Sequence, residues 1–112
     1  MSYRARQGDI IWLSLLPQAG HEQAGRRPAL VVSGNVFNDF SKTTAMVCPI
    51  TNTDRNLPLH VRLDSRTTTT GFVMCDQAKI LDIEARHATY IEQAPQDILL
   101  EAVDIISGII EV

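Results

Sequence analysis

Short apolar runs separated by turn-forming residues recur along most of the chain, and they limit the folds open to it. The most restrictive run is PALVV, which places five apolar residues together from Pro28 to Val32. An apolar run of this length is typical of a strand covered on both faces of a sheet. Pro28 fits only near its start, because proline cannot donate a ladder hydrogen bond. We therefore expect a central strand over residues 27–33.

Other runs of similar length predict further strands. They are residues 8–15 (GDIIWLSL), TAMVCPI ending at Pro49, LPLHVRL, GFVMCDQ, and one or two strands with a turn in KILDIEARHATYI. Segments rich in glycine, proline and small polar residues separate them, as expected for loops. The segment 18–26 is expected to be a flexible loop, and GNVFNDFSK a loop with one short helical turn. The threonines at 67–70 are interpreted as extended backbone.

The C-terminal segment has a helical period instead. In APQDILLEAVDIISGIIEV, Pro95 suits a first helical position and Asp97 the first turn. Leucine, alanine, valine and isoleucine recur at helical spacing and predict one buried face. That face consists of Leu99, Ala102, Val103, Ile106, Ile109 and Ile110. Short antiparallel strands and one amphipathic helix together predict a mainly β, α+β fold, a small and partly open barrel.

Length and composition favour one globular domain over residues 1–112. The formal net charge of −3 and pI of about 5.5 argue against a surface that binds nucleic acid everywhere, so an anion site must be local. Cys48 and Cys75 lie apart in apolar runs without zinc-ligand spacing, which indicates buried free thiols. No apolar stretch approaches a membrane span or a signal peptide. We expect a cytoplasmic protein with no metal and no cofactor.

Several polar residues stand where strands are expected to end. Arg26 and Arg27 precede the PALVV run, and the arginine fork matches phosphate oxygens, although an ordinary solvated strand end fits equally well. Thr51 offers a hydroxyl that is either a ligand-binding group or a turn cap. Asp76 and Gln77 follow a buried run, where a structural hydrogen bond is the plainer reading. His60 and His87 are expected to be surface or hydrogen-bonded core residues.

Longer motifs carry a family resemblance. GDIIWLSLLPQAGHEQAGRRPALVVS, followed by PITNT and GFVMCDQAKIL, resembles the MazF/PemK family of toxin endoribonucleases from bacterial toxin–antitoxin systems. The similarity runs from Gly8 to the final helix, and the E-Q-A-G-x-R-P segment is its most specific part. The resemblance implies an SH3-like (CcdB/MazF-type) barrel that forms a homodimer. It also implies metal-independent cleavage of single-stranded RNA at short specific sequences, leaving a 2′,3′-cyclic phosphate and a 5′-hydroxyl.

The resemblance also assigns roles to residues. Arg27 matches the arginine of the G-x-R-P pattern and would stabilise the phosphate in the transition state. Thr51 would donate a hydrogen bond to the same phosphate, and Glu22 would transfer a proton or orient the arginine. Residues with an implied role in RNA contact are Arg26, His21, Gln23, Asn35, Phe37, Asn52, Arg55 and Gln77. The expected partners are a cognate antitoxin with an acidic disordered tail and, only in complex with it, operator DNA; no membrane partner is expected.

The chain departs from part of the family at one position. Some members carry a further catalytic arginine two residues before the aspartate of the D-Q pair, and this chain has Met74 there. The acid and base roles of that branch do not transfer, so Asp76 is expected to have a structural or minor role.

Two other readings compete with an RNA-cleaving toxin. A CcdB-like toxin of the same architecture would act on DNA gyrase by binding protein, through its C-terminal helix end. A non-catalytic SH3-like adaptor would need no E-Q-A-G-x-R-P loop.

Overall fold

The central strand expected from PALVV is present as β2, Arg26–Val31, in the computed structural model, which describes residues 3–14 and 25–112. Its residues Ala29, Leu30 and Val31 are at most 3% exposed, so the strand is covered on both faces. It pairs antiparallel with β1 (Asp9–Ser14) on one side and with β3 (Thr44–Thr51) on the other. The prediction of a central strand is therefore confirmed.

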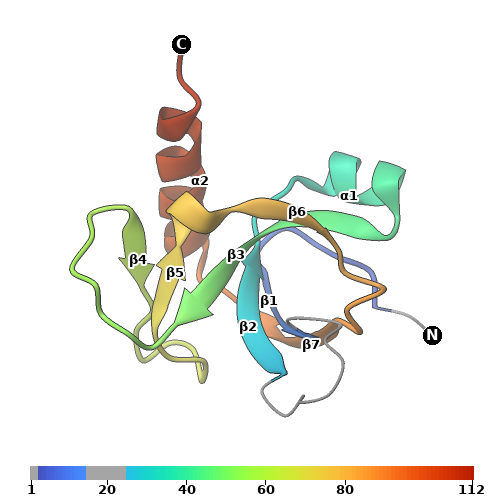
Figure 1. Cartoon of the computed structure of the whole chain (residues 1–112), viewed down its shortest axis with the longest axis horizontal. Helices are drawn as coiled ribbons and strands as arrows, with labels where there is room; N and C mark the ends of the chain where they lie inside the picture. The colour runs from blue at the N-terminus through green and yellow to red at the C-terminus, as the bar shows by residue number, and fades with distance from the viewer. Residues whose placement is uncertain (1–2, 15–24) are drawn as a thin grey trace.

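The remaining elements extend this sheet at both edges (Figure 1). They are β4 (His60–Arg62), β5 (Phe72–Met74), β6 (Lys79–Asp82) and β7 (Thr89–Gln93), with a 3-10 turn η2 (Cys75–Gln77) after β5. The described strands follow the order β4-β5-β3-β2-β1-β7, and β6 pairs with β3. No pairing joins β4 to β7 among these strands, so the barrel is open, as predicted.

Strand β3 continues to Thr51, so the prediction that it ends at Pro49 is wrong. Pro49 lies inside the strand opposite Ala29 of β2. On its other edge, β3 pairs with β6 up to Val47 and with β5 from Ile50. Pro49 thus falls where the partner strand changes, which is where a missing N–H group costs the ladder least.

Two α-helices accompany the sheet in residues 3–14 and 25–112. Helix α1 (Asn35–Ser41) replaces the single turn expected after β2, and α2 (Gln96–Ile109) is the predicted C-terminal helix. Figure 1 shows α2 beside β4 and β5, with its C-terminal end rising beyond the sheet. Ile109 and Ile110 are therefore 50% and 72% exposed, which corrects the prediction that both belong to the buried face. Among the described residues, no helix is long and apolar enough to cross a membrane.

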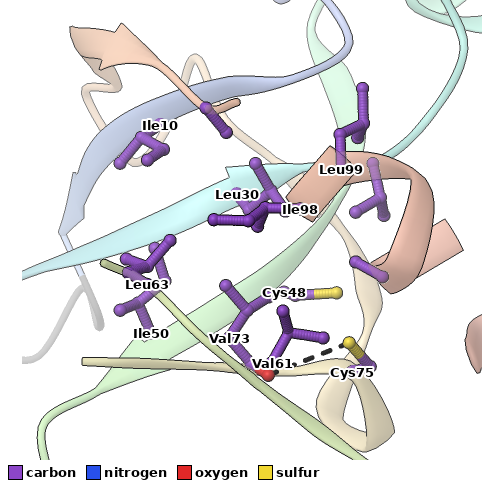
Figure 2. Packing of buried hydrophobic residues seen from close by; sticks show 13 residues of the cluster. Ile10, Leu30, Cys48, Ile50, Val61, Leu63, Val73, Cys75, Ile98 and Leu99 are labelled. Carbon is purple, nitrogen blue, oxygen red and sulfur yellow. Dashed lines mark hydrogen bonds between the residues drawn. The ribbon is translucent and has the colours of Figure 1, made fainter. Parts of the chain in front are cut away.

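The sheet has an apolar core on each of its faces. One core joins strands β1 to β5 to Ile98, Leu99 and Ala102 of α2 (Figure 2). The other lies on the opposite face and includes Ile11 and Val31. Adjacent residues such as Ile10 and Ile11, both fully buried, therefore belong to different cores, as the period of two of a strand requires. Cys48 and Cys75 are free and buried in the first core, as predicted.

Candidate functional site

A groove forms where the strand ends that carry Arg27 and Thr51 meet the loop between β4 and β5. Its volume is about 480 Å³. Residues that line it include Trp12, Arg27, Thr51, Asn52, Thr69 and Thr70. Arg27 and Thr51 are 24 positions apart in the sequence. Because β2 and β3 are antiparallel, the start of β2 lies beside the end of β3, and both residues line one hollow. Trp12 is 40% exposed and adds an aromatic surface on which a base can stack.

Arg27 projects from the second position of β2 and is exposed. Within residues 3–14 and 25–112, no hydrogen bond or ion pair engages its guanidinium, so the fork is available to an anion from solution. The arginine is therefore neither turned inward nor fixed to a described neighbour. A group that stabilises developing charge must be accessible in this way.

Arg27 also borders a second hollow on the opposite face of the sheet. This hollow has a volume of about 180 Å³ and an apolar floor that includes Leu13, Val47 and Leu81. Lys79 and Arg86 stand beside it, and Arg86 Nη1 donates a 3.2 Å hydrogen bond to the carbonyl of Ser14. Sequence reasoning missed both cations, because Lys79 reaches Arg27 through the pairing of β6 with β3 and Arg86 through the backbone hydrogen bond that its carbonyl accepts from Ser14. Three cations thus gather locally on a chain of net charge −3.

Thr51 ends β3, and its side chain caps a turn, which is one of the two alternatives left open by the sequence. Its Oγ1 accepts a 3.1 Å hydrogen bond from the N–H of Thr53, which is the turn-capping geometry. A hydroxyl has one donor and two acceptor lone pairs, so the O–H of Thr51 can still donate to a ligand in the groove. The cap fixes the side chain that lines the site.

The other predicted RNA contacts are dispersed. Arg26 donates a 2.7 Å hydrogen bond from Nη2 to Thr89 of β7. Asn35 and Phe37 belong to α1, which follows the far end of β2 and lies away from Arg27 (Figure 1). Arg55 and Gln77 are exposed and do not line the groove. The structure therefore brings Arg27, Thr51 and Asn52 to one groove, and the roles given to these and to the other residues remain predictions.

Three of the predicted site residues fall outside the described part of the chain. They are His21, Glu22 and Gln23. In the part that is described, no group of three or more histidine, cysteine, aspartate or glutamate side chains could hold a metal ion.

Asp76 has a partner, which supports its structural reading. Its Oδ1 lies 3.2 Å from Nε2 of His60, whose side chain is only 3% exposed. His60 is paired across the strands with Met74, so the three residues form one cluster beside η2. The Nδ1 of His60 is buried without a hydrogen-bond partner among the described residues, which corrects the expectation of a surface or fully hydrogen-bonded histidine.

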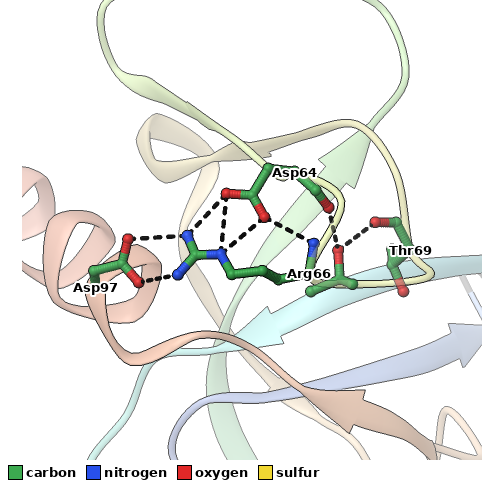
Figure 3. Close-up of polar contacts among 5 residues, drawn as sticks. Asp64, Arg66, Thr69 and Asp97 are labelled. Atoms are coloured by element: carbon green, nitrogen blue, oxygen red, sulfur yellow. Dashed lines mark hydrogen bonds and ion pairs between the residues drawn. The ribbon is translucent and has the colours of Figure 1, made fainter.

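The loop between β4 and β5 forms one wall of the groove and is fastened by an arginine. The guanidinium of Arg66 contacts both carboxylate oxygens of Asp64 and both of Asp97, at 2.8 to 3.2 Å (Figure 3). Asp97 is in the first turn of α2. The loop is thereby tied to the helix at a distance from Arg27 and Thr51.

The ion pair between Arg66 and Asp64 is expected to be sensitive to acid. Hydrogen bonds from Arg66 lower the pKa of Asp64 to about 2. Because the pKa of Asp64 is lower in the folded protein, the stability that this ion pair contributes is fully present above the ordinary aspartate pKa of about 3.9. It is lost as the pH falls through about 2. We expect a carboxyl NMR titration to place Asp64 near pH 2 in the native protein and near its ordinary value in Arg66→Ala. An Asp64 titration midpoint that is the same in Arg66→Ala and in the wild type would rule out this ion pair.

An open antiparallel barrel with an arginine and a threonine at one groove is the architecture expected for a toxin of the kind that the sequence resembles. The chain belongs to the PemK-like, MazF-like toxins of type II toxin–antitoxin systems, whose family model matches residues 6–109. The family expected from the sequence is thereby confirmed.

Named relatives agree with this membership. The chain is 38% identical to the endoribonuclease PemK of Escherichia coli over 93% of this chain and 80% of that protein. It is also 38% identical to the endoribonuclease toxin MazF of E. coli strain K12, over 78% and 77% of the two chains. The structure superposes with a TM-score of 0.85 on a crystal structure of MazE-MazF from Deinococcus radiodurans, at 33% identity and 96% coverage of both chains. The predicted fold class and the endoribonuclease toxin class are confirmed.

Proposed function

We propose that this protein cleaves single-stranded RNA in the groove between Arg27 and Thr51, without a metal ion, as the toxin of a toxin–antitoxin module. The single observation that carries the proposal is that the two residues share one solvent-open groove. In the family resemblance these are the two phosphate-binding residues. Cleavage of messenger RNA would then inhibit translation and growth.

The proposed reaction needs no cofactor, because the substrate supplies its own nucleophile. The RNA 2′-oxygen attacks the adjacent phosphorus and loses its proton, and the bond from phosphorus to the 5′-oxygen breaks. The leaving 5′-oxygen takes up a proton, so the products are a 2′,3′-cyclic phosphate and a 5′-hydroxyl. Arg27 stabilises the charge that develops on the phosphoryl oxygens, and Thr51 donates a hydrogen bond to them. Glu22 is proposed as the proton acceptor or as the group that orients Arg27.

Positive charge near Arg27 supports an RNA substrate. Lys79 and Arg86 stand next to Arg27 around the apolar hollow, so phosphates and a base can both be accommodated there. Asn52, at the rim of the groove, presents amide groups that can contact base edges. This arrangement explains how a chain of net charge −3 can bind a polyanion at one place.

Two protein partners are part of the proposal. Structural relatives are complexes named MazE-MazF, and we infer that this chain likewise binds a cognate antitoxin, whose acidic tail would cover the cations near Arg27. We also infer a homodimer, because large apolar side chains such as Val36 and Phe40 are 87% and 84% exposed on the single chain. Binding of operator DNA is expected only in the complex with the antitoxin.

One observation favours the alternative of a toxin that binds DNA gyrase. Ile109 and Ile110 are exposed at the end of α2, where a CcdB-like toxin would contact its target. Such a toxin would not need Arg27 or Thr51 at a common groove.

An RNA cleavage assay separates the two proposals. The purified protein is incubated with a mixed pool of RNA in excess EDTA, and the ends of the products are mapped. We expect cleavage at one short sequence, with 5′-hydroxyl and 2′,3′-cyclic phosphate ends. Intact RNA together with inhibition of gyrase supercoiling would favour the alternative, and cleavage that EDTA abolishes would contradict the metal-independent reaction.

A further inference from the structure

A carboxylate on β7 holds the part of the loop between β4 and β5 that lines the groove. The two oxygens of Glu92 accept four hydrogen bonds, from the N–H and the hydroxyl of Thr68 at 3.1 and 3.0 Å, and from the N–H and the hydroxyl of Thr69 at 2.8 and 2.7 Å. Both threonines line the groove together with Arg27 and Thr51. One side chain thus fixes the backbone and the side chains of two consecutive loop residues.

The next two loop residues, Thr70 and Gly71, contact Asn52 and Thr51 at the end of β3. The hydroxyl of Thr70 donates a 2.9 Å hydrogen bond to Oδ1 of Asn52. This bond fixes the carbonyl side of the Asn52 amide, so its NH₂ group keeps two donors for a ligand. The next residue, Gly71, lies so close to Thr51 that a Cβ placed on it would be 2.4 Å from the Thr51 carbonyl oxygen. The position of the loop therefore sets the positions of Thr51 and Asn52.

Charge also favours this arrangement. Burial raises the pKa of Glu92, but hydrogen bonds from Thr68 and Thr69 outweigh burial, and the pKa lies below its ordinary value. The carboxylate is thus ionised at neutral pH, with four donors directed at its two oxygens. Hydrogen bonds to an ionised acceptor are stronger than those to a neutral one, so the charge of Glu92 strengthens its hold on both threonines.

We propose that Glu92 is a positioning residue of the RNA groove, which holds Thr68 and Thr69 so that Thr51 and Asn52 are placed to meet the scissile phosphate and a neighbouring base. The inference rests on the proposed function, because it concerns the same groove. Glu92 itself touches no reacting atom. Pre-positioning of this kind matters because a misplacement of about 1 Å near a reacting group can cost on the order of 100-fold in rate.

Glu92→Gln tests the inference on the full-length protein. The amide NH₂ of glutamine cannot accept hydrogen bonds, so one of the four is lost if it takes the place of Oε1 and three are lost if it takes the place of Oε2. We expect kcat/KM for a fluorogenic RNA in EDTA to fall about 10- to 100-fold, and amide hydrogen exchange at Thr68 and Thr69 to become faster. Glu111→Gln, at an exposed position near the C-terminus, is the matched control and should behave as the wild type.

A second pair of variants keeps Glu92 in place. Thr69→Val removes one hydroxyl donor with little change of shape, and Thr69→Ser keeps the hydroxyl. A positioning role predicts lower kcat/KM in the valine variant and near-normal kcat/KM in the serine variant. Wild-type kcat and KM in both Glu92→Gln and Thr69→Val would overturn this inference alone, whereas a wild-type protein that does not cut RNA at all would overturn the proposed function and this inference with it.

Discussion

Arg27→Ala is expected to lower RNA cleavage more than any other single change in the described groove. Removing one donor that stabilises a developing oxyanion typically costs about 100- to 1,000-fold in kcat. The side chain of Arg27 is exposed near a strand end and has no bonded partner among the described residues, so its loss should leave the fold intact. The measurements are single-turnover cleavage of an RNA oligonucleotide in EDTA, growth arrest on expression, and thermal unfolding of the purified protein.

Two further variants make this result specific. Arg4→Ala removes an exposed arginine elsewhere on the chain and should cut RNA as the wild type does. Arg27→Lys keeps the charge but loses the two-pronged geometry of the guanidinium, so it should recover only part of the activity. An Arg27→Ala protein that remains fully toxic would remove Arg27 from the mechanism.

Gly71→Ala is expected to have the second large effect, on stability and on activity together. Gly71 has φ of +120°, a conformation that side chains rarely adopt, and its added Cβ would lie 2.4 Å from the Thr51 carbonyl oxygen. Holding a residue in such a backbone region costs on the order of 1–3 kcal/mol. Because relief of the clash must displace Thr51, cleavage should fall as well. Chemical denaturation and the RNA assay measure the two effects.

Gly108 provides the matched glycine control. It lies within α2, and a Cβ added there meets nothing within 4 Å. Gly108→Ala should therefore raise stability, by up to about 1 kcal/mol from helix propensity, and leave cleavage unchanged. Equal free energies of unfolding for Gly71→Ala and the wild type would show that the contact between Gly71 and Thr51 is not tight.

The pattern of apolar runs predicted the sheet well, because each run is a local signal. PALVV became the central strand, and the helical period after Pro95 became α2. The predictions failed where contacts between elements, rather than the local sequence, decide strand length or burial. Pro49 is tolerated within β3 because the partner strand changes there, and Ile109 and Ile110 are exposed because α2 extends beyond the sheet.

The candidate site was only partly predictable for the same reason. Arg27 and Thr51 were found through the motifs around them, and the structure places both in one groove. The sequence predicts only extended backbone for the threonines at 67–70, because nothing near them points to Glu92, which lies 23 and 24 positions from Thr69 and Thr68. Lys79 likewise reaches Arg27 only through strand pairing.

The most direct test of the account is an NMR titration with an oligonucleotide that has a 2′-deoxy substitution at the cleaved position and therefore cannot be cut. The account predicts saturable shifts of the Arg27 side-chain Nε–Hε signal and of the Thr51 amide, and loss of binding in excess salt. Binding that shifts signals around His60 or α1, while Arg27 and Thr51 stay unchanged, would contradict it.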